Sequence, residues 1–432
     1  MKKAYEYDLT NPKIMEYPYD FYEAIHRDDA RAVEVNGVGY WIGRMDDIKA
    51  ITKNTSTFSN SYFSEGGPIP TGVSGEPLEK DVKEVFDKGP KVVNALWTTD
   101  PPKHTLHRKL VNKAFTGKWV RSMEPKIRDI ANGLIDGFIF NGKTDFIKDY
   151  AVYVPMIVIA EALGMSRDDA EQFKHWSDDI LSGNLDVLDH KARLRVAKSF
   201  VEANNHFEAT IDERRKCPKD DLITSLAVAE VEGKSLDTSE VLPIVNTLML
   251  AGNETTTNLI GNAMRLLFEY PEVMDAISKD YTLIPGFIDE VMRFDAPVQC
   301  LYRVVTEDTE IGGIKIEKDS SIMLGWGTAG RDPKYFKNPN IFDIYRSNSS
   351  QNVGFGFGPH ICVGLGLAKA EARIAFETFF DRLKDIELDK NADLSHIPTF
   401  ATRGYKRLDL KFKNNNWFVL FNHIILKLRY FF

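Results

Sequence analysis

The chain has 432 residues, of which 43% are hydrophobic and 27% are charged, and its formal net charge is -8. This composition is typical of a globular protein with a sizeable core, and because no low-complexity linker divides the chain we expect one large domain. An acidic chain without a long basic run argues against nucleic acid as a partner. Three cysteines in a chain of this length fit a reducing cytoplasm better than a disulfide framework.

The N-terminal hundred residues mix strand and turn signals. Residues 1–8 contain lysines but no apolar run behind them, so we expect neither a signal peptide nor a membrane anchor. Residues 31–35 and 38–42 flank Asn36-Gly37, a dipeptide suited to a tight hairpin turn, and predict the start of a small sheet. Residues 60–97 are rich in glycine and proline, which predicts a long irregular segment.

Helical periodicity dominates the middle of the chain, from about residue 118 to 280, and residues 309–323 return to strand character around two glycines. These patterns predict a mainly α domain with small β-sheets. Within the helical region, residues 237–270 form one long predicted helix. Asp237 followed by Glu240 resembles a capping box at its start, and Pro271 marks its end.

The middle of this predicted helix contains a run that is unfavourable for a helix, Gly252 followed by Asn253, Glu254 and three threonines. A glycine costs about 1 kcal/mol relative to alanine inside a helix, so the run indicates a functional distortion. A buried acid beside a hydroxyl, here Glu254 and Thr255, is what proton delivery requires. The alternative is a surface glutamate with threonines that bond back to helix carbonyls, and the residues alone leave both interpretations open.

Two charged residues, Glu290 and Arg293, follow Pro285 at a spacing that puts them on one face of a helix. Most such pairs are solvated surface salt bridges worth under about 1 kcal/mol. The pattern alone therefore indicates little.

Near the C-terminus, residues 355–364 place Cys362 among glycines. Gly356, Gly358 and Gly364 would permit tight turns that bring backbone N–H groups close to the sulfur, and those dipoles stabilise a thiolate. Residues 364–373 are predicted to be helical, so the sulfur would lie at a helix N-terminus. The alternative is a buried structural cysteine, which is our interpretation of Cys217 and Cys300.

Residues 355–364 match F-G-x-G-x-H-x-C-x-G at every specified position, and this motif resembles the haem-binding signature of the cytochrome P450 superfamily. Other segments match independently: A-G-x-[DE]-T at 251–255, E-x-x-R at 290–293 and D-P-P-x-H-x-x-x-R at 100–108. The resemblance extends to about residue 412 and implies the triangular, mainly helical fold of the soluble prokaryotic members, in a haem domain spanning 1–412. Residues 413–432 form an apolar and basic tail of unknown role, too short for a spanning helix.

The resemblance implies that haem b (iron protoporphyrin IX) is bound, with Cys362 as the axial iron ligand and Phe355, Gly356 and Gly364 around it. Two haem propionates need cationic or hydrogen-bonding partners, and the positions implied for them are His104, Arg108, Arg303 and His360. Glu254 and Thr255 match the family's acid–alcohol pair, and Gly252 leaves room for oxygen. Glu290, Arg293 and Arg346 match a structural cluster.

The implied activity is a monooxygenase that inserts one atom of O2 into a hydrophobic organic substrate such as a terpenoid, steroid, fatty acid or polyketide, by hydroxylation or epoxidation. The residues that the resemblance assigns to the substrate pocket are Val92, Val93, Ala95, Leu96, Leu250, Ala251, Val298, Gln299, Thr399 and Phe400. A peroxide-driven peroxygenase and a non-catalytic haem sensor are the alternatives.

No flavin, nicotinamide or iron–sulfur motif is present in the sequence, so electrons must come from another protein. We expect a ferredoxin or flavodoxin with an NAD(P)H-dependent reductase. A locally basic stretch could steer an acidic donor to the thiolate side of the haem, or it could be only a solvated charged face; its members are Lys103, Arg108, Lys109, Lys113, Lys118 and Arg121.

Overall fold

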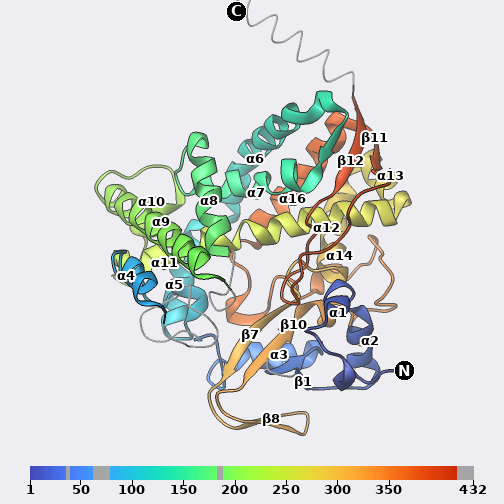
Figure 1. The fold of residues 1–432 in the computed structure, drawn as a ribbon, viewed down its shortest axis with the longest axis horizontal. Helices are drawn as coiled ribbons and strands as arrows, with labels where there is room; N and C mark the ends of the chain where they lie inside the picture. The colour runs from blue at the N-terminus through green and yellow to red at the C-terminus, as the bar shows by residue number, and fades with distance from the viewer. Residues whose placement is uncertain (36–38, 62–77, 182–187, 416–432) are drawn as a thin grey trace, which may run out of the picture.

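The computed structural model describes residues 1–35, 39–61, 78–181 and 188–415. Helices make up most of the fold, and a smaller β-rich part contains the N-terminus (Figure 1). The α-helices are α1 (Pro12–Glu16), α2 (Tyr19–Arg27), α3 (Met45–Lys53), α4 (Lys80–Phe86), α5 (Lys103–Ala114), α6 (Gly117–Phe138), α7 (Tyr153–Ala162), α8 (Ala170–Leu181), α9 (His190–Lys216), α10 (Leu222–Ala227), α11 (Thr238–Ala251), α12 (Glu254–Glu269), α13 (Pro271–Lys279), α14 (Ile284–Phe294), α15 (Trp326–Ala329) and α16 (Leu365–Arg382).

The strands form small sheets, as expected. The largest sheet has the order β1 (Val33–Val35), β2 (Gly39–Ile42), β10 (Ser321–Gly325), β7 (Cys300–Val305) and β3 (Phe58–Ser59), and only the β2–β10 pair is parallel. A second sheet has the order β11 (Leu383–Leu388), β12 (Asp409–Asn414) and β4 (Lys143–Asp145). Two hairpins complete the strands: β5 (Glu230–Val231) with β6 (Lys234–Ser235), and β8 (Thr309–Ile311) with β9 (Ile314–Ile316).

Most of the predicted elements are present. Strands β1 and β2 pair antiparallel as expected, although the turn residues 36–38 lie outside the described part of the chain. The strands predicted around residues 309–323 are β8, β9 and β10. The expectation of an irregular segment over 60–97 is wrong where α4 forms, and residues 62–77 within it are not described.

The predicted helix over 237–270 is interrupted. Asp237 caps α11 through the expected capping box with Glu240, but the helix ends at Ala251 and α12 begins at Glu254. The unfavourable run therefore lies at the break itself. Strand β12 continues to Asn414, two residues past the expected boundary at residue 412, and residues 416–432 of the tail are not described.

One large apolar cluster fills the helical part, and α12 runs through it in contact with α7, α14 and α16. Two smaller clusters lie in the β-rich part, one of them between the N-terminal helices and the largest sheet. The long α12 and α16 thus lie against each other inside the protein. Their N-terminal ends carry Glu254 and the residues that follow Cys362.

Candidate active site

Cys362 lies in a loop between a short 3-10 turn, Gly358–His360, and the start of α16. Its backbone N–H donates to the carbonyl of Phe355 at 2.8 Å, which closes the loop. Gly356 and Gly358 have φ values of +79° and +75°, a region that L-residues rarely adopt. Gly364 does not share this requirement, because its φ is -84° and a Cβ there would lie at an ordinary 3.9 Å from the sulfur.

The sulfur of Cys362 interacts with the N-terminus of α16. The backbone N–H groups of Gly364 and Leu365 and the charge of Arg108 favour the thiolate, but burial outweighs them and raises the pKa of the thiol above its ordinary value. The residue still keeps an exposed surface. Peptide dipoles alone therefore do not ionise this thiol, and a cation bound to the sulfur would supply the remaining stabilisation.

The other two cysteines differ from each other. Cys300 is buried in β7, and burial raises the pKa of its thiol well above the ordinary value. Cys217 is exposed at the C-terminal end of α9, so the expectation that it is buried is wrong.

Two histidines predicted to contact the propionates face each other. The ring of His104 on α5 lies 3.9 Å from the ring of His360, centroid to centroid. Both ring nitrogens of His104 and Nε2 of His360 are buried without a hydrogen-bond partner among the described residues. Burial and the neighbouring cations lower the pKa of His104 to about 4 and that of His360 to about 3. At neutral pH both rings are hydrogen-bonding groups and carry no charge.

The two arginines predicted for the same role lie beside these rings. Arg108 donates to the carbonyl of Ile361 at 2.5 Å and to Asn112 at 3.1 Å, and its charge acts on both histidines. Arg303 on β7 donates to the carbonyl of Tyr302 at 2.6 Å, and its charge helps to lower the pKa of His360.

The structure thus brings the four predicted propionate contacts together next to the cysteine loop. Buried imidazole nitrogens without partners and two guanidinium groups match what a pair of enclosed carboxylates needs. A thiol at a helix N-terminus matches what an iron ligand needs. The donor set therefore fits haem.

The break between α11 and α12 contains the predicted acid and alcohol. The hydroxyl of Thr255 donates to the carbonyl of Ala251 at 2.8 Å, so this threonine bonds back across the break, as the alternative interpretation expected. Gly252 lies against the carbonyl of Leu248, which would be 3.1 Å from a Cβ. The hydroxyl of Thr255 therefore links the first turn of α12 to the last residue of α11.

Glu254 is not a surface glutamate, because its side chain is half-buried at the start of α12. Burial raises the pKa of its carboxyl, and the hydroxyl of Thr402 at 3.4 Å and the nearby amide of Asn258 only partly oppose that shift. A carboxyl with a raised pKa holds its proton more readily near neutral pH. Glu254 can therefore act as a proton donor.

Glu290 and Arg293 form a fully buried ion pair instead of a surface salt bridge. Arg293 donates to both carboxylate oxygens at 2.7 and 2.8 Å, and Arg346 donates at 3.3 Å, as expected for the third member. Ser349 and the backbone N–H of Asp343 complete the carboxylate's partners. Burial opposes ionisation of Glu290, but these donors together hold its pKa below the ordinary value.

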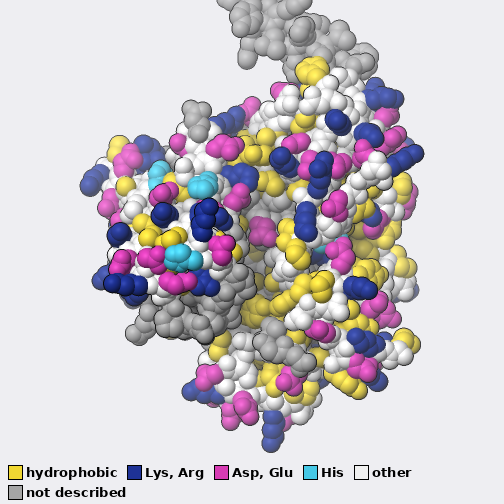
Figure 2. Space-filling model, in the orientation of Figure 1, with side chains coloured by type: hydrophobic (Ala, Val, Ile, Leu, Met, Phe, Trp, Pro, Cys, Tyr) yellow, Lys and Arg dark blue, Asp and Glu magenta, His cyan; other side chains and the backbone are white. Residues whose placement is uncertain are grey.

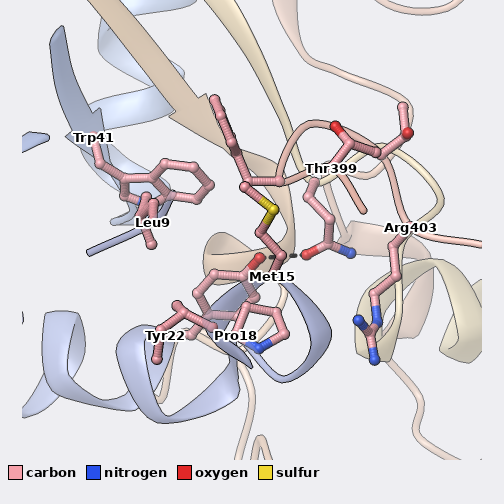
Figure 3. Close-up of a pocket in the computed structure, with 11 residues that line it drawn as sticks. Leu9, Met15, Pro18, Tyr22, Trp41, Thr399 and Arg403 are labelled. Carbon is pink, nitrogen blue, oxygen red and sulfur yellow. Dashed lines mark hydrogen bonds between the residues drawn. The ribbon is translucent and has the colours of Figure 1, made fainter. Parts of the chain in front are cut away.

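The predicted substrate-pocket residues do not all gather in one place. Val92, Ala95 and Leu96 are buried in the large apolar cluster, whereas Val93, Leu250 and Val298 are half-buried and Ala251 is exposed. Gln299, Thr399 and Phe400 line a different pocket, formed with the N-terminal residues (Figure 3). The Gln299 amide is occupied there, because it accepts from Tyr22 and donates to the carbonyl of Ala296, both at 2.5 Å.

Sequence reasoning did not single out Thr402 or Glu371. Thr402 contacts Glu254, but nothing in its local sequence signals that contact, which joins residues far apart in the chain. Glu371 is buried on α16 beside Thr256, and burial raises its pKa well above the ordinary value. Its neighbours Lys369 and Arg373 are charged, so the local sequence does not signal that Glu371 is buried.

The predicted basic stretch is partly neutralised. Lys109 pairs with Glu232 at 2.9 Å, Lys113 donates to the carbonyl of Glu230, and Lys103 lies 3.9 Å from Glu240. On the face in Figure 2, cations and anions are interspersed without a continuous field of one sign. Lys118 and Arg121 are exposed at the start of α6, and no ion pair forms with either among the described residues.

Within the described residues, no helix combines the length and the apolar character that crossing a membrane would need. This finding concerns helices only.

The family model "Cytochrome P450" matches residues 74–401. Putative cytochrome P450 YjiB of Bacillus subtilis is 32% identical, with 94% of this chain and 98% of that protein covered. Cytochrome P450 monooxygenase PikC of Streptomyces venezuelae is 32% identical, with coverages of 73% and 75%. The crystal structure of CYP109E1 from Bacillus megaterium in complex with corticosterone is 30% identical and superposes with a TM-score of 0.79, covering 92% of this chain and 99% of that one.

The YjiB match in sequence and the CYP109E1 match in fold each extend over more than nine-tenths of the chain. The chain belongs to the cytochrome P450 family, whose members bind haem b, and it is a haem-thiolate monooxygenase.

Proposed function

We propose that Cys362 is the axial ligand of the haem iron, and that His104, Arg108, Arg303 and His360 hold the propionates. This assignment rests on one observation: three features lie close together. They are the sulfur at the N-terminus of α16, the imidazole nitrogens without hydrogen-bond partners, and the two arginines. When bound, thiolate-ligated haem activates O2, and one oxygen atom enters the substrate while the other leaves as water. Glu290, Arg293 and Arg346 support the loop that precedes the ligand.

Glu254 and Thr255 are proposed to deliver the protons that this reaction consumes. Burial raises the pKa of the Glu254 carboxyl, so that it holds the proton it would donate. The Thr255 hydroxyl belongs to the next residue of α12. Thr255 can turn its hydroxyl away from the carbonyl of Ala251 to pass on a proton, at the cost of one hydrogen bond of about 1 kcal/mol. Gly252 keeps a side chain out of the break.

Replacing Thr255 by alanine tests this role. We expect the fraction of reducing equivalents recovered in product to fall by about tenfold, with hydrogen peroxide released instead, because a proton relay typically contributes at least that much. Thr255→Ser keeps the hydroxyl and should stay close to the wild type. Product and peroxide are measured per NAD(P)H consumed. Unchanged coupling in Thr255→Ala would remove Thr255 from the relay.

The proposed substrate is a hydrophobic small molecule. Half-buried Val93, Leu250 and Val298 and exposed Ala251 supply apolar surface, and apolar pockets favour apolar ligands. The similar CYP109E1 structure contains corticosterone, so steroids are the first class to screen for a spectral shift, followed by terpenoids, fatty acids and polyketides.

The proposed electron donor is an acidic ferredoxin or flavodoxin that is reduced by an NAD(P)H-dependent reductase, in the cytoplasm. Lys118 and Arg121 flank Val120, which packs 3.6 Å from the position of a Cβ on Gly366, at the start of α16. These exposed cations therefore lie on the side of the protein where Cys362 and α16 begin. They replace Lys109 and Lys113 as the docking candidates, since those two are engaged by the β5–β6 hairpin.

Reversing both charges in Lys118→Glu/Arg121→Glu should slow reduction by the donor several-fold at low salt, and the difference should shrink as salt screens the interaction. The matched control, Lys315→Glu/Lys318→Glu, changes the net charge equally on exposed residues in and beside β9. Stopped-flow reduction rates at two salt concentrations provide the measurement. Equal slowing in both variants would show a net-charge effect and reject the docking site.

A further inference from the structure

A polar stripe on α12 contacts the chain segment 402–404. Glu254, Asn258 and Asn262 are spaced four residues apart and so lie on one side of the helix. Thr402 Oγ1 lies 3.4 Å from Glu254 Oε1, and Asn262 donates to the carbonyl of Arg403 at 3.0 Å. A Cβ on Gly404 would lie only 1.9 Å from Asn258 Oδ1, so the segment can approach this closely only with glycine there.

Thr402 also borders a pocket next to the N-terminal helices α1 and α2. The pocket is small, with room for about one water molecule, and Figure 3 shows Tyr22, Thr399 and Arg403 around it. Its apolar wall includes Ile14 and Trp41. Its polar residues are Tyr22, Gln299, Thr402 and Arg403, of which Tyr22 and Gln299 hydrogen-bond to each other. A cavity with several polar groups is suited to holding ordered water.

Thr402 is thus the residue that belongs both to the pocket and to the hydrogen-bond partners of Glu254. After Glu254 has released a proton to the active site, its carboxylate must be protonated again before the next turnover. An ionised carboxylate can only accept a hydrogen bond, so in that state the Thr402 hydroxyl donates to Glu254 across the 3.4 Å contact. A hydroxyl can also accept a hydrogen bond from water at the same time.

We propose that water in the N-terminal pocket returns protons to Glu254 through the hydroxyl of Thr402. In this step the Thr402 O–H bond breaks as a Glu254 O–H bond forms, and the Thr402 oxygen takes one proton from a pocket water, which is restored from solvent. No electrons are transferred. The inference rests on the proposed role of Glu254, and Thr402 acts through Glu254 as a positioning residue.

The test compares Thr402→Val, which removes the hydroxyl at nearly constant shape, with Thr402→Ser, which keeps it. In the holoenzyme, we expect Thr402→Val to lower product per NAD(P)H by about threefold or more and to increase the solvent isotope effect on turnover, while Thr402→Ser stays near the wild type. Thr210→Val controls for the loss of a hydroxyl, because Thr210 is a half-buried threonine on α9 whose hydroxyl donates to the carbonyl of His206 within the same helix.

Two readouts do not depend on turnover. A crystal structure of the holoenzyme should show an ordered water within hydrogen-bond distance of Thr402 Oγ1 in the pocket. Infrared titration of the Glu254 carboxyl, assigned with Glu254→Gln, should show a higher pKa in Thr402→Val, because a donor that favours the carboxylate is lost.

Filling the pocket provides an independent perturbation. Ile14→Phe adds bulk to the pocket wall without altering Thr402, and it should reproduce the uncoupling of Thr402→Val. If Glu254→Gln uncouples the enzyme while Thr402→Val and Ile14→Phe do not, or if the pocket is dry, this inference is wrong and the proposed role of Glu254 stands. If Glu254→Gln itself leaves coupling unchanged, the proposed acid is wrong and the inference falls with it.

Discussion

Cys362→Ala is expected to abolish the thiolate signature of the enzyme, namely the carbon-monoxide band of the reduced protein, and with it product formation. Alanine offers no atom that can bind iron, and in the described part of the chain the other cysteines lie on α9 and β7, outside the loop. The proposed propionate contacts remain in the variant, so we expect haem to be retained only weakly. The reduced carbon-monoxide difference spectrum and the haem content of the purified protein are the measurements.

Cys217→Ala is the matched control for that experiment. Cys217 is exposed at the end of α9, so its replacement should leave the spectrum and the haem content unchanged. A full-strength thiolate band in Cys362→Ala would show that another group binds the iron. A lost band in Cys217→Ala would point instead to general damage by cysteine replacement.

Arg293→Ala is expected to be the most destabilising of these single changes. It leaves the Glu290 carboxylate buried and without its bidentate partner, and it removes donors to the carbonyls of Gly330, Pro339 and Ile341. Breaking a buried ion pair by removing one partner typically costs about 3–5 kcal/mol. We therefore expect a large fall in the free energy of unfolding, measured by urea denaturation of the holoenzyme, and poor recovery of folded protein.

Two variants interpret that result. Arg293→Lys keeps the charge but loses the paired geometry, so it should be intermediate. Lys279→Ala removes one partner of an exposed pair with Asp275 and should cost less than about 1 kcal/mol. If Arg293→Ala were as mild as Lys279→Ala, the cluster would not support the fold in the way that its geometry indicates.

The sequence predicted local features well where a residue's own chemistry decides the outcome. The capping box at Asp237, the hairpin strands around residue 37 and the helix after Cys362 all follow from nearby residues. The break at Gly252 was signalled by a run that disfavours helix. The burial of Glu290 was not signalled, because an isolated E-x-x-R pattern contains no information about the loops that cover the pair.

Local sequence patterns did not predict contacts between segments that are far apart in the chain. Gln299 and Phe400, which are expected at the substrate pocket, border the N-terminal pocket together with residues nearly the whole chain away. The sequence gives no sign that Lys109 and Lys113 contact the β5–β6 hairpin, where they pair with Glu232 and with the carbonyl of Glu230. Thr402 was missed for the same reason, because its contact with Glu254 on α12 joins residues far apart in the chain.

The parallel pairing of β2 with β10 joins residues 40–42 to residues 322–324. During synthesis on the ribosome, the N-terminal hairpin must therefore wait for about 280 further residues before its neighbour emerges, at roughly 5–20 residues per second. Until then, one edge of that hairpin has no partner strand and is open to pairing with other chains. This topology therefore leaves one edge of the N-terminal hairpin unpaired until late in synthesis.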